Sequence, residues 1–352
     1  MLKSYIAINY EIKGVQKLIE FLVLEVWCKP NSQRCRTILN NELKALYDEY
    51  DWFKQNVNTI YTVCKTLNAV DLNTLKTTFE NNNQIEKLCN GTLKPIYISA
   101  LHKDLRKPIN AFFSELYSRF LGWALIHKTY KKKKDYYDEL ISKNNFTECP
   151  CCGFGDIKTD YSDGHSPFDH YLPQKHYPLS TINFDNLVPM CHSCNSDYKG
   201  EKDIIKNGQK VFYPYLKTHP QIEIIVDFNT SKLPLLINKA GVDKLPKGYF
   251  KVSFNINIEE TESWNKIFNI KNRYSWKIAD NRVSWFNDIR QMYRDVDIVT
   301  NTSTDAINKV IKYDSTKHLG FIKSAYLEKI KSLPHLLKAI EEVSGSSVNN
   351  AI

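Results

Sequence analysis

Two short stretches, "ECPCCGF" (148–154) and "CHSCNSDYKG" (191–200), decide how the middle of this 352-residue chain folds. Each contains a Cys-x-x-Cys pair, and 38 residues separate the two pairs. The four cysteines are Cys149, Cys152, Cys191 and Cys194. Four thiolates suit tetrahedral Zn²⁺, and a closed shell of cysteines leaves no position for water or substrate. The spacing therefore predicts a structural zinc that ties two distant segments together.

The overall composition is ordinary for a soluble globular protein, with 42% hydrophobic and 25% charged residues. The N-terminus shows no basic region followed by a long apolar segment, so we expect no secretory signal. The apolar stretch "LIEFLVLEVWC" (18–28) is too short to span a bilayer and predicts a buried helix. We expect a cytoplasmic protein without a membrane partner. Nine cysteines in such a chain favour metal ligation and reduced thiols over disulfides.

Changes in hydrophobic pattern along the chain predict an α+β protein. The expected regions are a mostly helical domain (1–140), a central unit organised by the zinc (141–212), a mixed α+β domain (213–343) and a flexible tail (344–352). Apolar residues recur every three or four positions over 38–60, which predicts one buried helix face. The run "KKKK" (131–134) is interpreted as a solvated helix end, with phosphate contact as the alternative.

The mixed region contains three further predicted elements. The stretches 222–228 and 250–256 predict strands from their β-branched content and alternation. The stretch 277–296 predicts a helix with one apolar face. Trp285 falls on that face and is interpreted as a core residue.

Between the cysteine pairs lie polar residues in a specific order. Asp169-His170 precedes "YLP", Asn186 follows sixteen residues after His170, and Asn195 comes directly after the last cysteine. Lys199-Gly200 closes the series. Together with the cysteines, this order resembles the HNH nucleases, whose ββα-metal fold packs a two-stranded hairpin on a helix around a divalent cation. The resemblance covers 149–200, which is 52 of 352 residues.

The resemblance implies a role for each residue. His170 would be the general base that activates water, and Asn186 would brace the loop that carries it. Asp169 and Asn195 would hold a catalytic Mg²⁺ or Mn²⁺. Asn195 stands where the family often has His, and an amide oxygen suits Mg²⁺ better than an imidazole does. No Gly-Gly pair follows "DHYLP", which leaves the substrate contacts of that loop open.

The residue chemistry agrees with these roles, although each residue has a simpler interpretation. Hydrolysis of a phosphodiester needs a nucleophile, a base and a cation that stabilises the departing oxygen. The simpler alternatives are a turn cap for Asn186 and a helix start for Asn195. His165 and His176 flank the site and are interpreted as loop histidines without a role. Cys151 and His192 lie within the two Cys-x-x-Cys pairs and are interpreted as residues that do not bind the zinc.

The net charge of +9 favours a polyanionic partner. Lys199 is expected to contact a neighbouring phosphate. Basic and aromatic residues alternate between Trp264 and Arg294, where basic groups would neutralise phosphates and aromatic rings would stack on bases. The candidate phosphate contacts there are Arg273, Lys277, Arg282, Arg290 and Arg294.

The sequence therefore predicts a zinc-containing, Mg²⁺- or Mn²⁺-dependent HNH endonuclease that hydrolyses DNA. Its large flanking regions suggest sensing or docking, with a place in bacterial anti-phage defence or a mobile element. A protein partner, such as an ATPase encoded in the same operon, is a further expectation. The alternatives are an RNA-cleaving HNH nuclease and a non-catalytic zinc module that binds nucleic acid or protein.

Overall fold

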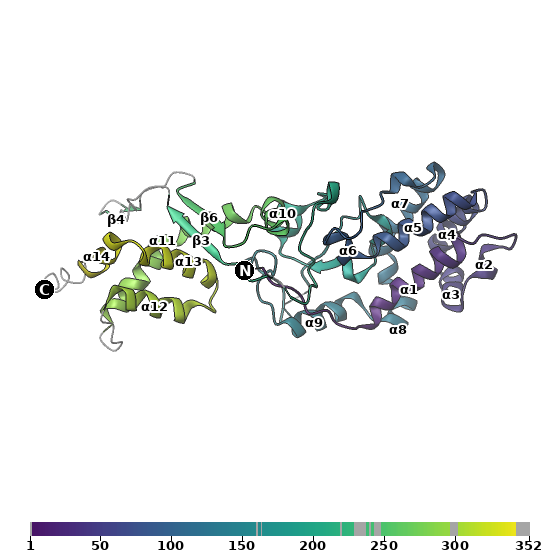
Figure 1. Ribbon diagram of the computed structural model, residues 1–352. Coiled ribbons are helices and arrows are strands. Elements are labelled where there is room, and N and C mark those ends of the chain that lie inside the picture. Colours follow the sequence, from purple (N-terminus) through teal and green to yellow (C-terminus); the bar gives the residue numbers. More distant parts are fainter. Residues whose placement is uncertain are drawn as a thin grey trace. The chain divides into compact units, whose positions relative to one another are not determined.

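The computed structural model describes residues 2–159, 161–162, 164–218, 220–228, 237–238, 241–242, 248–295 and 302–342 (Figure 1). The chain forms two compact units, one over Leu2–His219 and one from Pro220 onward, and each is described by itself. Helices dominate, with a few small antiparallel sheets, in agreement with the predicted α+β class. The predicted tail (344–352) lies outside the described residues, as does the end of the predicted helix at 296.

The first unit contains nine α-helices among its described residues. They are α1 (Gly14–Phe21), α2 (Cys35–Ile38), α3 (Asn41–Glu49), α4 (Asp51–Cys64), α5 (Ala69–Asn82), α6 (Ile85–Cys89), α7 (Lys103–Ser118), α8 (Ala124–Tyr130) and α9 (Lys133–Asn144). Short 3₁₀ turns are η1 (Glu11–Lys13), η3 (Ile98–Ala100), η4 (Phe120–Gly122), η5 (Pro178–Ser180), η6 (Phe184–Asn186) and η8 (Lys206–Gly208). The π-helix η2 (Leu22–Trp27) extends α1. Leu22, Val23, Val26 and Trp27 are buried, so the predicted buried helix is confirmed.

The periodic stretch 38–60 forms two helices rather than one. Tyr50 has extended backbone angles (φ −115°, ψ 104°), which end α3 and allow α4 to begin at Asp51. The Tyr50 ring stacks on Trp123 at 3.9 Å between centroids, which stabilises this break. The predicted apolar face is buried on both sides of the break, where Leu43 and Phe53 are fully covered, while Tyr50 at the break is half-buried.

A short hairpin and a helix follow the helical region. Strand β1 (Phe168–His170) pairs antiparallel with β2 (Leu187–Pro189), with Asp169 opposite Val188 and His170 opposite Leu187. The π-helix η7 (Ser193–Lys199) comes directly after β2. Tyrosine hydroxyls tie β2 to the rest of the unit, because Tyr5 donates to the Pro189 carbonyl (2.9 Å) and Tyr215 to the Leu187 carbonyl (2.5 Å). These two hydrogen bonds anchor β2 within the first unit.

The second unit packs helices against a two-stranded sheet. Strand β3 (Ile224–Phe228) pairs antiparallel with β6 (Phe250–Phe254), and β4 (Ile237–Asn238) pairs with β5 (Gly241–Val242). The helices are α10 (Glu259–Phe268), α11 (Ile270–Arg294), α12 (Ser303–Asp314), α13 (Gly320–Lys331) and α14 (Pro334–Glu342). The strands predicted at 222–228 and 250–256 are confirmed. The helix predicted at 277–296 is part of the longer α11, on which Trp285 is buried as expected.

None of the described helices is both long and apolar enough to cross a membrane.

Candidate functional site

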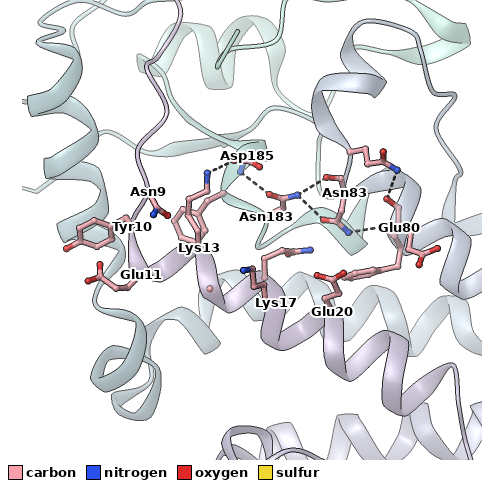
Figure 2. A pocket seen from close by; sticks show the side chains of 15 residues that line it. Asn9, Tyr10, Glu11, Lys13, Lys17, Glu20, Glu80, Asn83, Asn183 and Asp185 are labelled. Atoms are coloured by element: carbon pink, nitrogen blue, oxygen red, sulfur yellow. Dashed lines mark hydrogen bonds and ion pairs between the residues drawn. The ribbon is translucent and has the colours of Figure 1, made fainter. Parts of the chain in front are cut away.

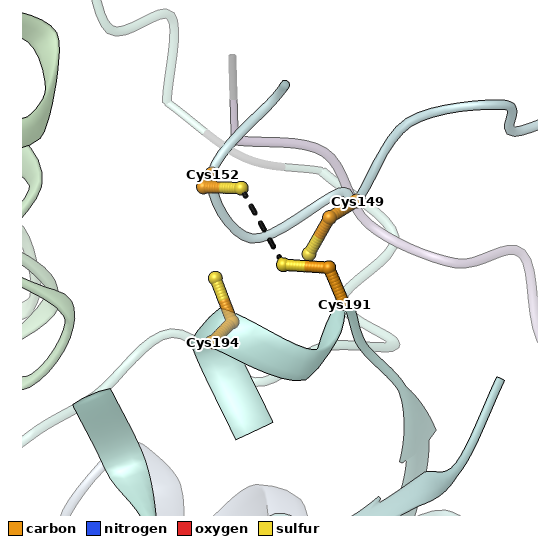
Figure 3. A group of neighbouring side chains, drawn as sticks. All are labelled: Cys149, Cys152, Cys191 and Cys194. Atoms are coloured by element: carbon orange, nitrogen blue, oxygen red, sulfur yellow. Dashed lines mark hydrogen bonds between the residues drawn. The ribbon is translucent and has the colours of Figure 1, made fainter. Parts of the chain in front are cut away.

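The four predicted zinc ligands converge in the first unit. Their sulfur atoms all lie within 4.8 Å of one another, and all four side chains are buried (Figure 3). The Cys152 and Cys191 sulfurs are 3.9 Å apart. Zinc–sulfur bonds of about 2.3 Å in a tetrahedron require sulfurs about 3.8 Å apart, so this spacing suits the ion. The cluster can hold a metal such as zinc.

The local backbone explains why these sulfurs converge. The Cys149 N–H donates to the Gly155 carbonyl (2.6 Å), and the Gly153 N–H donates to the Cys149 carbonyl (2.7 Å). The Gly155 N–H also points at the Cys152 sulfur, at 3.3 Å. A Cβ on Gly155 would lie only 2.5 Å from the Cys191 sulfur, so no side chain fits there. The sequence analysis missed Gly155, although a glycine closing a Cys-x-x-Cys turn is a recognisable signal.

The burial of the cysteine thiols is compatible with a bound cation. Burial raises the pKa of Cys149 well above its ordinary value, because a thiolate there loses its hydration. A bound cation would offset that cost and hold the thiols deprotonated. His192 is a poor candidate for a ligand, since its side chain is 79% exposed. Among the described residues, the group that could hold a metal ion consists of the four predicted cysteines and includes neither Cys151 nor His192.

Asp169 is a buried carboxylate, and only one of its oxygens accepts a hydrogen bond from a described residue. Its side chain is 4% exposed on β1, and its Oδ1 accepts a hydrogen bond from the Lys199 ammonium at 3.0 Å. Its Oδ2 is buried and has no hydrogen-bond partner among the described residues. Burial raises the pKa of Asp169, while Lys199 opposes that shift. An unpaired buried carboxylate oxygen is costly unless a cation or donor completes it.

His170, the next residue on β1, is held in one tautomer. Its Nε2 lies 3.0 Å from the Thr181 carbonyl oxygen. Since a carbonyl only accepts, Nε2 carries the proton and Nδ1 presents the free lone pair. Burial lowers the pKa of His170 to about 4, so the imidazole is neutral near pH 7. The Tyr117 ring from α7 meets the imidazole edge-on, with centroids 4.7 Å apart.

Asn186 lies where a brace for this loop has to be. Its side-chain oxygen accepts from the Leu172 N–H (2.7 Å), and its amide group donates to the Leu172 carbonyl (3.0 Å). A longer bond of 3.4 Å runs from the amide group to the Ser180 carbonyl. The backbone carbonyl of Asn186 also accepts from the Tyr171 N–H. Asn186 therefore fixes the two residues that follow His170.

Helix η7 carries the last two predicted site residues. Asn195 is half-buried and lies four residues before Lys199, so the two side chains share a helix face. Lys199 is 1% exposed, and its ammonium donates to Asp169 and to the His170 carbonyl (2.7 Å). The expectation that Lys199 faces a phosphate is corrected by this placement, because the side chain points into the protein and orients Asp169.

The predicted phosphate contacts of the second unit occupy varied positions on α11. Arg273 is 5% exposed and donates to the Phe268 carbonyl, so it does not present its guanidinium at the surface as expected. Arg282 and Arg290 are half-buried, and Arg290 lies over the Phe286 ring at 5.0 Å. Lys277 is half-buried and Arg294 is exposed. The roles of Lys277, Arg282, Arg290 and Arg294 stay predictions.

The two flanking histidines contact backbone carbonyls. His165 Nδ1 lies 2.9 Å from the Ser166 oxygen, and His176 Nε2 lies 3.2 Å from the Glu201 oxygen. Neither residue belongs to the group formed by Asp169, His170 and Lys199. The sequence analysis missed Tyr117, which touches His170 from a helix more than fifty residues earlier in the chain.

A separate open groove of about 920 Å³ lies beside α1 (Figure 2). Asn183 donates to both oxygens of Asn83 across it, and Lys13 pairs with Asp185 at 2.6 Å. The lining includes more acidic residues (Glu11, Glu20, Glu80 and Asp185) than basic ones (Lys13 and Lys17), so its charge does not favour a polyanion such as nucleic acid.

Comparison with known proteins gives one partial likeness. No family model matches the chain, and no solved structure matches it. A stretch of 87 residues is 32% identical to Protein ea31 of Escherichia phage lambda. The likeness covers 24% of this chain and 26% of that protein, so this chain spans about a quarter of the relative it matches.

Proposed function

We propose that this protein is a metal-dependent, HNH-type endonuclease that hydrolyses phosphodiester bonds of DNA. One observation carries the proposal. A two-stranded hairpin presents a neutral histidine of fixed tautomer beside a buried carboxylate with an unpaired oxygen. The segment after that histidine is braced by Asn186, and the following helix begins in the cysteine cluster.

His170 acts as the general base. Its Nδ1 takes a proton from water, and the resulting hydroxide attacks phosphorus while the bond to the 3′ oxygen breaks. The products carry a 5′ phosphate and a 3′ hydroxyl, whose proton comes from solvent. The Thr181 carbonyl, bonded to Nε2–H, holds the ring in place and stabilises the imidazolium that forms.

Asp169 and Asn195 are suited to a hard cation. The unpaired Oδ2 of Asp169 is a carboxylate oxygen, and Asn195 offers an amide oxygen on the face of η7 that also carries Lys199. Bound there, Mg²⁺ or Mn²⁺ would supply charge stabilisation at the phosphate and the departing oxygen. Lys199 fixes the carboxylate by holding its other oxygen.

The proposed zinc has a structural role in this scheme. Cys191 lies just before η7 and Cys194 within it, while Cys149 and Cys152 come from a loop before β1. Closing the four sulfurs around one ion therefore sets where η7 begins. Through Lys199, that position is coupled to Asp169. A four-cysteine shell has no open position, so the zinc itself takes no part in hydrolysis.

A non-catalytic zinc module explains these features less well. Burying Asp169 and Lys199 beside a desolvated histidine costs stability, because charged groups lose hydration. A module that only binds would not need this arrangement. The positive net charge supports a nucleic-acid substrate. A place in mobile elements or anti-phage defence, with an ATPase from the same operon as partner, is a further part of the proposal.

The test compares duplex DNA, single-stranded DNA and RNA as substrates for the purified full chain with Mg²⁺, with Mn²⁺ and with EDTA. We expect metal-dependent cutting of DNA, with 5′ phosphates on the products. Cutting of RNA alone would replace DNA as the substrate. Binding of these nucleic acids without cutting under any of the metal conditions would favour the zinc-module alternative.

A further inference from the structure

We infer that Lys133, on α9, holds a phosphate of the substrate against His170, with the Tyr117 ring as the surface that supports its ammonium group. This inference rests on the proposed nuclease function and adds a substrate-binding residue to it. Lys133 belongs to the "KKKK" run (131–134), where phosphate contact was the alternative to a solvated helix end.

Two ring contacts connect Lys133 to the site. The Lys133 ammonium lies 4.2 Å from the centre of the Tyr117 ring, within the range of a cation–π interaction. The same ring meets the His170 imidazole, with 4.7 Å between centroids and planes at 71°. The ammonium and the proposed base therefore both contact one tyrosine ring.

The carboxylates near Lys133 interact with other groups rather than with its ammonium. Asp135 accepts a hydrogen bond from the Lys132 N–H at 3.2 Å, and Asp138 pairs with Lys134 at 2.5 Å. Asp169, in the site itself, is already bonded to Lys199. In the part of the chain that the structure describes, no ion pair involves Lys133.

A half-buried ammonium without a carboxylate is unfavourable, and a bound anion would compensate it. Burial lowers the pKa of Lys133, which agrees with a desolvated cation that lacks a partner. A phosphodiester carries the matching negative charge, and an ammonium binds it as a point charge. Lys133 thus supplies the phosphate contact that the sequence assigned to Lys199, whose ammonium is used by Asp169 and the His170 carbonyl.

The experiment uses Lys133→Ala, with Lys134→Ala as the matched control. Lys134 is the adjacent residue, is exposed and pairs with Asp138. Binding of a labelled DNA duplex is measured in the His170→Ala background, so that no cutting interferes, over a series of NaCl concentrations. Loss of one phosphate contact should reduce the slope of log Kd against log salt by about 0.9. The control should leave the slope unchanged, and Lys133→Arg should restore it.

Single-turnover cutting with His170 intact gives the second measurement. We expect Lys133→Ala to slow cutting at least about tenfold, as loss of a charge-stabilising group does. If wild type cuts and Lys133→Ala matches Lys134→Ala in slope and rate, the inference is overturned while the nuclease function stands. If Lys133→Ala changes the salt slope but the wild-type protein cuts no DNA, the phosphate contact stands and the proposed nuclease function is overturned. Failure of the full chain to bind nucleic acid overturns both.

Discussion

Replacing Asn186 with alanine should weaken both the fold and the proposed site. The side chain is fully buried and makes bonds of 2.7 and 3.0 Å to the backbone of Leu172. Losing the acceptor leaves the buried Leu172 N–H unpaired, which costs about 1–3 kcal/mol. The two donated bonds add about 0.5–1.5 kcal/mol each, so we expect a total of about 2–6 kcal/mol. In a unit of this size, the melting temperature should fall by about 4–24 °C.

The assay combines thermal unfolding of the full chain with DNA cutting at a temperature where every variant is folded. Asn183→Ala is the matched control, because Asn183 is also buried and hydrogen-bonded but contacts Asn83 and the Asp185 N–H rather than the segment after His170. Both variants should lose stability, and only Asn186→Ala should lose most of its cutting rate. A melting temperature within 1 °C of wild type, or equal loss of cutting in both variants, would refute the bracing role.

The remaining predictions concern the cysteine cluster and the second unit. Metal analysis should find one zinc per chain, retained by Cys151→Ser and lost by Cys149→Ser; retention by both would remove Cys149 from the ligand set. Gly155→Ala should lower stability by about 1–3 kcal/mol, measured by urea unfolding with zinc present, because its Cβ would meet the Cys191 sulfur. Burial alone would raise the pKa of Asp314, but hydrogen bonds from Lys317 and Lys323 outweigh it and lower that pKa. The resulting stabilisation is fully present above the pKa of Asp314 in the unfolded chain, which is about 4. It is lost as the pH falls through the lower pKa that Asp314 has in the folded chain. Asp314→Asn should therefore destabilise the second unit in urea unfolding at pH 7, and the effect should shrink as the pH falls below about 4; an effect that does not change with pH would contradict the ion pair.

The sequence predicted those features that depend on local spacing. Periodic apolar residues correctly marked the buried faces of α3 and α4, and alternation correctly marked β3 and β6. The Cys-x-x-Cys spacing correctly brought four sulfurs together, because each pair closes its own turn. The break at Tyr50 was not predictable in this way, since it depends on stacking against Trp123, far along the chain.

The direction of individual side chains in the site depended on tertiary packing. Lys199 lies near the predicted metal ligands in sequence, and it was expected to face a phosphate. Its inward position follows from the position of η7 beside β1, which places Asp169 within hydrogen-bonding distance of the Lys199 ammonium. Tyr117 contacts His170 from α7, and Lys133 on α9 contacts the Tyr117 ring. No local pattern marks such contacts, because they arise only when the helices fold over the hairpin.

The most direct test of the proposed hydrolysis compares single-turnover cutting of DNA by wild type, His170→Ala and His192→Ala, all loaded with zinc and supplied with Mg²⁺. His192 is an exposed histidine between Cys191 and Cys194 and serves as the matched control. We predict that His170→Ala loses at least about 100-fold in rate, whereas His192→Ala cuts as wild type does. Equal rates for all three proteins would contradict the assignment of His170 as the base, and no cutting by wild type would contradict the hydrolytic function itself.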